Sequence, residues 1–173
     1  NAQTLTHLCD PYGVEVEVMG PFLLDGIAVS SSRIRELIKT GRLEEASRLL
    51  GRDYPVFGRV IEGMKRGRLL GYPTANLDLS EEIYPPIGVY AVDVIRNGRT
   101  YRGVANLGRN PTFQDPRDSG SSPLSLEIHI LDFDQMIYGE QIQVNFRRKI
   151  RGELRFDSTD ELADQIRSDI DWA

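Results

Sequence analysis

The chain has 173 residues, 40% of them hydrophobic and 27% charged, with 21 Lys and Arg against 26 Asp and Glu. This length and composition predict one soluble domain with a normal core and part of a second domain, and the acidic balance argues against a dedicated nucleic-acid-binding protein, which usually has a basic excess. The single cysteine, Cys9, excludes an intrachain disulfide and argues against a Cys/His zinc site. It also favours a reducing, cytoplasmic location. No apolar run approaches the ~20 residues that cross a bilayer.

The first third of the chain shows mostly helical signals. Val and Glu alternate over residues 14–18, which predicts a short strand. Three serines, Ser30–Ser32, offer N-caps for a helix that ends at Gly41, and a second short helix is predicted over residues 43–50. The stretch Asp53-Tyr54-Pro55 indicates a boundary, after which the chain changes character.

Beyond this boundary the signals are those of strands and turns. Alternating or β-branched runs predict strands over residues 89–95, 100–107, 124–130 and 142–146. Asn97-Gly98 predicts a tight hairpin between the first two, because both residues tolerate positive φ. Many short strands at close spacing predict an antiparallel barrel or a sandwich.

A helix is predicted at the C-terminal end. A capping box at Ser158 would begin it, and Leu162, Ile166 and Ile170 form an apolar stripe that we expect to be buried. Between the strands, residues 114–123 are rich in Asp, Ser, Gly and Pro and predict a mobile loop.

The first candidate for chemistry is the stretch Gly63-Met64-Lys65-Arg66-Gly67-Arg68, followed by Gly71. Glycines let backbone N–H groups approach a ligand closely, and cations lie among them, a combination that suits a polyphosphate. The stretch is neither a Walker A loop nor a dinucleotide fingerprint. A solvated turn with a basic tip is the alternative interpretation.

The second candidate is Pro73-Thr74-Ala75-Asn76. In an extended segment Thr74 and Asn76 lie on one face, and their hydroxyl and carboxamide oxygens suit Mg²⁺, which also accepts phosphate oxygens as ligands. The alternative is ordinary turn chemistry beside Pro73.

The third candidate is Glu127. It lies in a predicted strand on the face opposite Leu126 and Ile128, where a carboxylate could act as a general base, although an ordinary outward-facing Glu is the commoner case. His129 shares this face as a neighbour, a hydrogen-bonding partner or an exposed residue. Six aromatic residues could line a pocket for a flat ring or belong to the core: Tyr72, Tyr90, Tyr101, Phe113, Phe133 and Phe146.

In this order the segments resemble the riboflavin kinase family. The matching stretches are Gly63 to Gly71, Tyr72-Pro73-Thr74-Ala75-Asn76-Leu77, Gly88-Val89-Tyr90, Gly103 to Gly108, Asn110-Pro111-Thr112-Phe113, Leu126 to Leu131 and Phe156-Asp157-Ser158. The resemblance implies a mainly β fold, a six-stranded antiparallel Greek-key barrel with a C-terminal helix. Residues 53–173 are therefore expected to form a kinase domain that uses ATP to phosphorylate riboflavin to FMN.

Residues 1–52 resemble the tail of a nucleotidyltransferase domain. The stretch from Val29 to Arg35 is similar to the motif Ile-Ser-Ser-Thr-x-Ile-Arg, with Val and Ser in place of Ile and Thr. Both parts in this order resemble the prokaryotic bifunctional riboflavin kinase/FMN adenylyltransferases, or FAD synthetases, so a short α/β remnant of the adenylyltransferase is expected here. The His-x-Gly-His phosphate motif is absent from the sequence, so we do not expect this chain to make FAD by itself. The absence of an initiator Met suggests a fragment, and N-terminal processing is the alternative explanation.

The resemblance also implies roles for individual residues. The loop residues Gly63, Lys65, Arg66, Gly67 and Arg68, together with Tyr72 and Thr74, would bind ATP. Thr74 and Asn76 would bind Mg²⁺ with phosphate oxygens, and Glu127 would take the proton from the ribityl hydroxyl. The candidates for contact with riboflavin, between the barrel and the last helix, are Arg151, Asp157 and Thr159.

Two rival functions stay open at this point. The first is a flavin- or nucleotide-binding module without turnover, which the presence of Glu127, Thr74 and Asn76 argues against. The second is a nucleic-acid-binding barrel of the OB type, for which an acidic chain offers no evident basic groove. ATP/ADP and riboflavin/FMN are the expected partners, and neither nucleic acid nor a membrane is expected.

Overall fold

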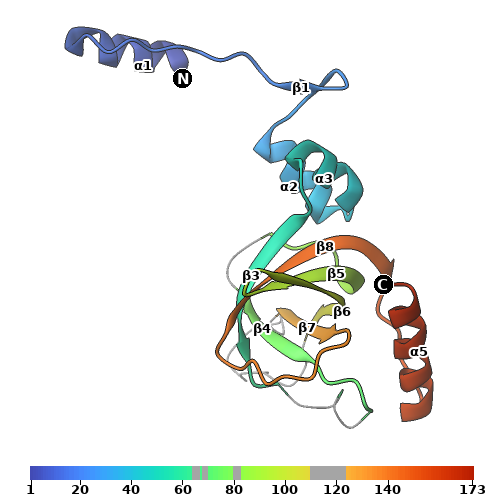
Figure 1. Ribbon diagram of the computed structural model, residues 1–173. Coiled ribbons are helices and arrows are strands. Elements are labelled where there is room, and N and C mark those ends of the chain that lie inside the picture. Colours follow the sequence, from blue (N-terminus) through green and yellow to red (C-terminus); the bar gives the residue numbers. More distant parts are fainter. Residues whose placement is uncertain (64–66, 68–69, 80–82, 110–123) are drawn as a thin grey trace, which may run out of the picture. The chain divides into compact units, whose positions relative to one another are not determined.

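The computed structural model describes residues 1–63, 67, 70–79, 83–109 and 124–173 (Figure 1). The chain forms two compact units, Asn1–Ser31 and Ser32–Ala173. No helix among the described residues is long and apolar enough to cross a membrane.

The first unit contains two helical segments and a small hairpin. These elements are α1 (Ala2–Cys9), the 3₁₀ helix η1 (Asp10–Tyr12), β1 (Leu23–Leu24) and β2 (Ile27–Ala28). The prediction of a strand over residues 14–18 is wrong. A strand needs a partner, and none of the described residues pairs with this segment. The hairpin forms instead around Asp25-Gly26, where both residues have positive φ (51° and 75°).

The second unit begins with the two helices that the sequence predicts, α2 (Ser31–Lys39) and α3 (Leu43–Leu50). Leu37, Ile38 and Ala46 are buried together between them, while Leu43 of α3 belongs to the core of the barrel that follows. The compact unit therefore includes α2 and α3 as well as the barrel. The assignment of residues 1–52 to a nucleotidyltransferase remnant stays a prediction about their origin.

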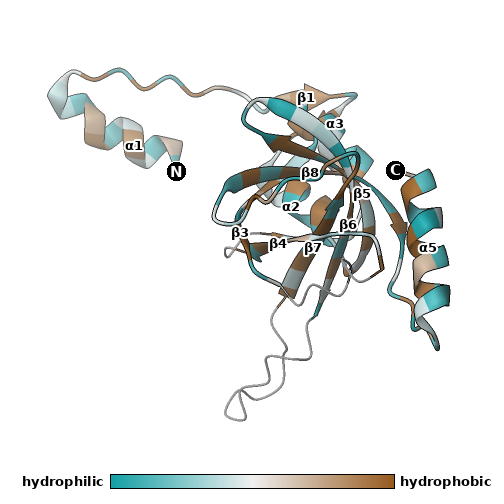
Figure 2. Cartoon of the chain, turned by 60° about the horizontal axis from the view of Figure 1, so that its bottom comes forward, coloured by the Kyte–Doolittle hydropathy of each residue, from teal (hydrophilic) through white to brown (hydrophobic). Residues whose placement is uncertain are grey.

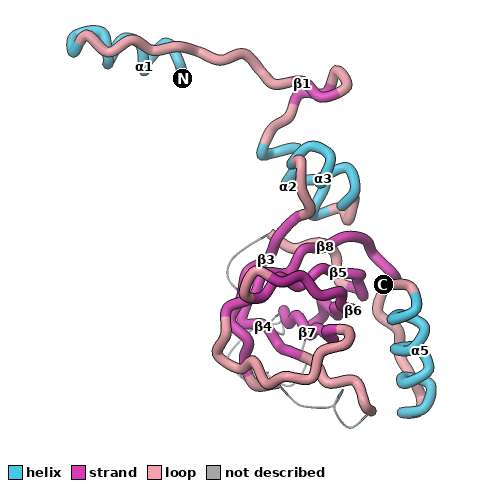
Figure 3. The backbone as a smooth tube through the Cα atoms, in the orientation of Figure 1, coloured by secondary structure: helices cyan, strands magenta, loops and turns pink. Residues whose placement is uncertain are grey.

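Six antiparallel strands close into a barrel in the order β3-β4-β7-β6-β5-β8. Their bounds are β3 (Tyr54–Ile61), β4 (Ala75–Leu79), β5 (Gly88–Arg96), β6 (Arg99–Arg109), β7 (Leu124–Ile130) and β8 (Gln141–Arg151). Figure 3 shows the strands around the barrel, with helix α5 (Thr159–Asp171) beside them and in contact with β6. The mainly β fold with a closed six-stranded barrel and a C-terminal helix is confirmed, and the sandwich is excluded.

The barrel core follows in part from a period of two, since burial alternates along β3 and β7, whereas five consecutive residues of β5 (residues 88–92) are buried. Figure 2 shows apolar and polar residues interspersed along the strands. In β7, Leu126, Ile128 and Ile130 are buried while the residues between them are partly exposed. Tyr90 and Phe146 are fully buried and pack edge to face at 5.2 Å, so these two aromatic candidates belong to the core.

The predicted hairpin turn at Asn97-Gly98 and the predicted cap at Ser158 are confirmed. Asn97 and Gly98 have φ of 49° and 76° and join β5 to β6. Ser158 caps α5, and its Oγ accepts a hydrogen bond from the Glu161 backbone N–H at 3.2 Å. The apolar stripe of α5 is only half-buried, however, and the buried residue of this helix is Asp169.

Candidate functional site

The strand register brings three polar residues into one row across the barrel. Glu127 on β7 is paired with Asn76 on β4 and, on its other side, with Asn106 on β6. Leu126 and Ile128 point into the core, so Glu127 faces outward, as expected from the sequence. Side chains of directly opposed residues lie about 5 Å apart at Cβ, so the row places a carboxylate between two carboxamides.

Two glycines of the predicted phosphate loop lie against the segment Tyr72-Pro73-Thr74-Ala75-Asn76, which supplies one end of this row. A Cβ added to Gly63 would be 2.1 Å from Asn76 Nδ2 and 2.7 Å from Asn76 Oδ1, and a Cβ added to Gly67 would be 2.4 Å from the Tyr72 carbonyl oxygen and 3.2 Å from Thr74 Cγ2. The backbone at both glycines therefore approaches the segment with Thr74 and Asn76 so closely that any side chain at either position would displace a neighbouring group. The loop cations Lys65, Arg66 and Arg68 lie outside the described residues, as do Phe113 and the loop predicted over residues 114–123.

His129 holds the turn that precedes Thr74. Its Nδ1 lies 2.9 Å from the Pro73 carbonyl oxygen, and because a carbonyl accepts hydrogen bonds, Nδ1 carries the proton. The Tyr72 ring stands at 90° to the His129 ring, with 5.5 Å between centroids. Of the roles considered for His129, the structure shows the hydrogen-bonding partner.

A cavity of about 170 Å³ opens beside Thr74. Pro73, Thr74 and Ala75 line one side, with Ile128 and Ile130 of β7. The connection between β7 and β8 forms the other wall with Phe133, Asp134, Gln135, Met136, Ile137 and Tyr138. Phe133 was predicted from the sequence as a candidate for a ring pocket, but the connection as a whole was not, because only the barrel register brings residues 133–138 next to Thr74.

Arg96, near the end of β5, holds this wall of the cavity. Its guanidinium makes two hydrogen bonds to the Glu140 carboxylate, of 2.7 Å and 2.9 Å, and one to Gln135 Oε1 of 3.0 Å. It also lies 5.5 Å from the centroid of the Phe133 ring. The hydrogen bond to Glu140 raises the pKa of Arg96, and the same bond lowers the pKa of Glu140 below its usual range.

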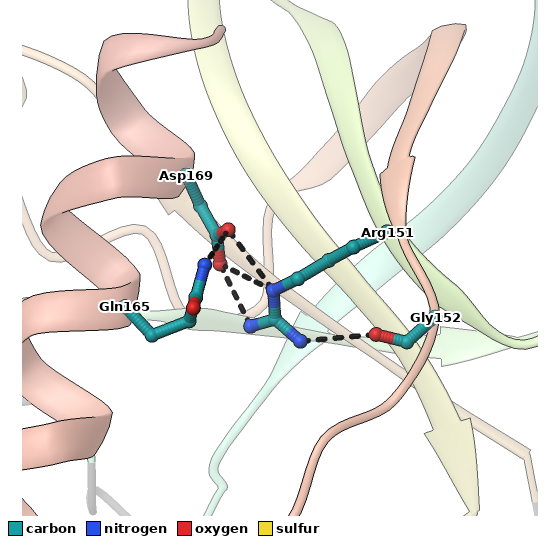
Figure 4. Close-up of polar contacts among 4 residues, drawn as sticks. All are labelled: Arg151, Gly152, Gln165 and Asp169. Carbon is teal, nitrogen blue, oxygen red and sulfur yellow. Dashed lines mark hydrogen bonds and ion pairs between the residues drawn. The ribbon is translucent and has the colours of Figure 1, made fainter.

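The three residues predicted to contact riboflavin lie at the junction of β8 and α5. Arg151 is the last residue of β8, and its guanidinium binds the Asp169 carboxylate (Figure 4). Asp157 and Thr159 are exposed where α5 begins. The connecting segment reaches β6, because a Cβ added to Gly108 would be 2.7 Å from Glu153 Oε1 and 3.7 Å from Asn106 Nδ2. One end of the polar row therefore lies close to this junction.

The oxygen donors near Thr74 suit a hard cation that is bound partly by the protein and partly by a substrate. Among the described residues, no group of three or more His, Cys, Asp and Glu could hold a metal ion by itself. The Thr74 hydroxyl and the Asn76 carboxamide offer neutral oxygen donors, and Mg²⁺ commonly binds through few protein oxygens together with waters and phosphate oxygens.

Comparison with known proteins identifies the family of the chain. The sequence model of the riboflavin kinase family matches residues 50–173. The chain is 44% identical over 163 residues to the bifunctional riboflavin kinase/FMN adenylyltransferase of Haemophilus influenzae, covering 94% of this chain and 51% of that protein. For the Bacillus subtilis protein of the same description the identity is 44% over 142 residues, covering 82% of this chain and 44% of that protein. The chain thus spans about half the length of the curated relatives that it matches.

Among solved structures, one described as a macrolide-efflux protein from Streptococcus pneumoniae is similar to nearly the whole chain. The TM-score is 0.80 with 39% sequence identity, over 99% of this chain and 54% of that one. The similarity supports the fold, including the helices that precede the barrel.

Proposed function

Because the chain belongs to the riboflavin kinase family, we propose that it transfers the γ-phosphoryl group of ATP to the 5′-hydroxyl of the ribityl chain of riboflavin, giving FMN and ADP. The observation that supports this most strongly is the row of Asn76, Glu127 and Asn106, with Gly63 packed against Asn76. Phosphoryl transfer needs mainly positioning and neutralisation of charge, and the row offers a base and neutral oxygen donors side by side.

Glu127 is the proposed general base. Its carboxylate would accept the hydroxyl proton of the ribityl chain as that oxygen forms its bond to the γ-phosphorus, while the bond from the γ-phosphorus to the bridging oxygen breaks and ADP leaves. A strand that is paired on both sides holds Glu127 in place. Little reorganisation is then needed during the reaction.

Thr74 and Asn76 are the proposed ligands of Mg²⁺, together with oxygens of the ATP phosphates. A divalent cation at this position would neutralise charge on the transferred group. Gly63 and Gly67 would let the backbone of their loop approach the same phosphates, and Lys65, Arg66 and Arg68 are the proposed cations of that loop. His129 and Tyr72 hold the turn before Thr74 and so would orient its hydroxyl.

We assign the cavity beside Thr74 to the base of ATP. A cavity with both apolar and polar lining next to the proposed phosphate site suits a flat heterocycle with polar edges, and its wall is held by the Arg96–Glu140 pair. The proposed flavin side is the junction of β8 and α5, with Asp157 and Thr159 as contacts and Arg151 on the same side of the site. The approach of Glu153 to β6 beside Asn106 supports this choice.

For the longer protein we propose the second activity that its relatives' descriptions name, adenylylation of FMN to FAD, with residues 1–52 as part of that domain. The sequence lacks the His-x-Gly-His motif, so this chain alone is expected to make FMN without FAD. A single cysteine is consistent with the cytoplasm as the proposed compartment.

The decisive experiment incubates this chain with riboflavin and Mg-ATP and follows FMN and FAD in one chromatogram, with and without EDTA. FMN that appears only with free Mg²⁺ supports the proposal. Tight riboflavin binding without FMN would indicate a binding module that lacks turnover. If neither turnover nor flavin binding occurs, salt-dependent binding of single-stranded DNA would favour the OB-type alternative.

A further inference from the structure

A polar cluster around the buried Asp169 joins the end of the barrel to the last helix (Figure 4). We call it the Arg151 cluster; its members are Arg151, Gln165 and Asp169. Arg151 Nε lies 3.0 Å and 3.1 Å from the two Asp169 carboxylate oxygens, and Nη2 lies 2.7 Å from Oδ2. The Gln165 side chain donates to Asp169 Oδ1 at 2.9 Å.

The cluster has to remain intact because Asp169 is buried. The Asp169 side chain is 3% exposed and that of Arg151 18%. A carboxylate so far from water is tolerated only when it is paired and hydrogen-bonded, and removing one partner of a buried pair leaves an uncompensated charge. The position of α5 against the barrel is therefore coupled to the Arg151–Asp169 pair.

Arg151 also holds the segment that leads into α5. Its Nη1 donates to the Gly152 carbonyl oxygen at 3.0 Å, and its guanidinium lies 5.8 Å from the centroid of the Phe156 ring. This is the segment whose Glu153 approaches Gly108 and Asn106 on β6. Arg151, the last residue of β8, thus contacts both the connection and the helix.

The rest of the α5 interface is less tightly packed than the barrel core. The apolar residues Leu162, Ile166 and Ile170 are only half-buried, whereas the core residues of β7 are almost completely buried. Half-buried side chains contribute less hydrophobic stabilisation, which is roughly proportional to buried area. The position of α5 therefore depends on the Arg151 cluster more than a helix with a fully buried apolar face would.

We infer that Arg151, Gln165 and Asp169 are positioning residues for riboflavin. They fix α5 and the segment that leads into it against β6, and thereby shape the flavin side of the site without donating to the flavin themselves. Most of the Arg151 hydrogen-bonding capacity is directed at Asp169 and Gly152, which favours this role over direct contact. The inference rests on the proposed function.

Four variants test it. Arg151→Met and Asp169→Leu each remove one partner of the pair, and Arg151→Met/Asp169→Leu replaces both by apolar side chains, a change that is often neutral for a buried pair. Asp164→Asn is the matched control, because Asp164 is a carboxylate on the same helix with its side chain 73% exposed, paired with Arg167. For each variant we would measure kcat, the KM for riboflavin, the KM for Mg-ATP, and hydrogen exchange of the α5 amides.

Each single variant should raise the KM for riboflavin at least about tenfold, with the KM for Mg-ATP unchanged, and should accelerate exchange of the α5 amides. The double variant should recover both the riboflavin KM and the α5 protection in the same proportion. Asp164→Asn should match the wild type.

Three results would overturn the inference. A higher riboflavin KM in Arg151→Met with unchanged α5 protection would make Arg151 a direct flavin ligand. A loss of α5 protection with a normal riboflavin KM would show that the position of the helix does not affect riboflavin binding. Normal α5 protection and a normal riboflavin KM in the single variants would show that the Arg151 cluster does not fix the helix. A wild-type chain that forms no FMN overturns the proposed function and the link to riboflavin, while hydrogen exchange still decides whether the cluster holds α5.

Discussion

Substituting Gly63 by Ala should impair catalysis while leaving the fold intact. Gly63 has no positive φ, so alanine is compatible with its backbone conformation. The added methyl group would, however, lie 2.1 Å from Asn76 Nδ2 and 2.3 Å from Asn76 Cγ. The conflict is thus between one methyl group and the side-chain amide that we propose as a metal ligand.

The size of the effect follows from these distances. Ordinary carbon–nitrogen contacts are about 3.5 Å, so the Asn76 amide has to move by roughly 1.4 Å. The amide is the free end of a side chain, so it is expected to move instead of the strand. A misplacement of about 1 Å in a reacting arrangement costs about 10²-fold in rate. We therefore expect kcat/KM for Mg-ATP to fall about 10²-fold, whereas stability should rise by no more than about 1 kcal/mol, the usual effect of Gly→Ala on the unfolded chain.

The assay is steady-state FMN formation over a series of Mg²⁺ and ATP concentrations, with urea unfolding of each variant. Gly20→Ala is the control, since no atom lies within 4 Å of the position of its Cβ and its φ is not positive. Asn76→Ala should itself raise the Mg²⁺ and ATP concentrations needed for half-maximal activity. Gly63→Ala/Asn76→Ala should be no worse than Asn76→Ala, because the methyl group then has room.

Near-normal activity of Gly63→Ala would refute this reasoning, since the Asn76 amide would not need its observed position. A double variant impaired by the product of the two single effects would mean that Gly63 acts through something other than Asn76. Unchanged Mg²⁺ dependence in Asn76→Ala would assign that residue to turn structure.

Three further predictions concern a base, an ion pair and a buried phenol. Glu127→Gln should lower kcat by about 10²-fold or more with both KM values near normal, as for loss of a general base; near-normal kcat in rapid-mixing and steady-state assays would remove Glu127 from the mechanism. The pKa of Glu140 is lowered from its ordinary 4.5 by the hydrogen bond from Arg96, so the stabilisation is present above pH 4.5 and is lost as the pH falls through the lowered pKa. The urea midpoint of the wild type should therefore exceed that of Glu140→Gln at pH 7 and approach it at pH 3, and a constant difference would contradict the pairing. Burial raises the pKa of Tyr90 from 10.0 to about 12. The contribution of its neutral phenol to the free energy of unfolding is therefore fully present below pH 10 and is lost as the pH rises toward 12. The wild type should lose about 1 kcal/mol more than Tyr90→Phe between pH 9 and pH 11, and equal losses would show that another group titrates.

Local physics made much of the architecture predictable from the sequence. Alternating or β-branched runs located four of the barrel strands, Asn97-Gly98 located a hairpin because its backbone needs positive φ, and Ser158 located the start of α5. These signals depend on neighbouring residues alone. The order of the family motifs was likewise sufficient to identify the riboflavin kinase family.

Two barrel strands were missed because their pattern is weak in the sequence, and the short hairpin around Asp25-Gly26 was missed although its turn signal is local. Strand β3 contains Pro55 and Gly58, and the alternation of β4 covers only five residues, so neither had a clear pattern. The Val/Glu alternation over residues 14–18 did predict a strand, but a strand also requires a partner, which the described residues do not supply.

Only the tertiary structure decided how the site is assembled. The register of β4, β7 and β6 placed Asn76 and Asn106 beside Glu127, and hydrogen bonds between distant strands are not visible in a local pattern. Asp169 lies three residues after Ile166, on the face that the apolar stripe predicts to be buried, and a carboxylate there is acceptable only because Arg151 reaches it from β8. Sequence periodicity determines which face of an element is apolar, whereas contacts between distant segments determine which charges can be buried and which polar groups meet.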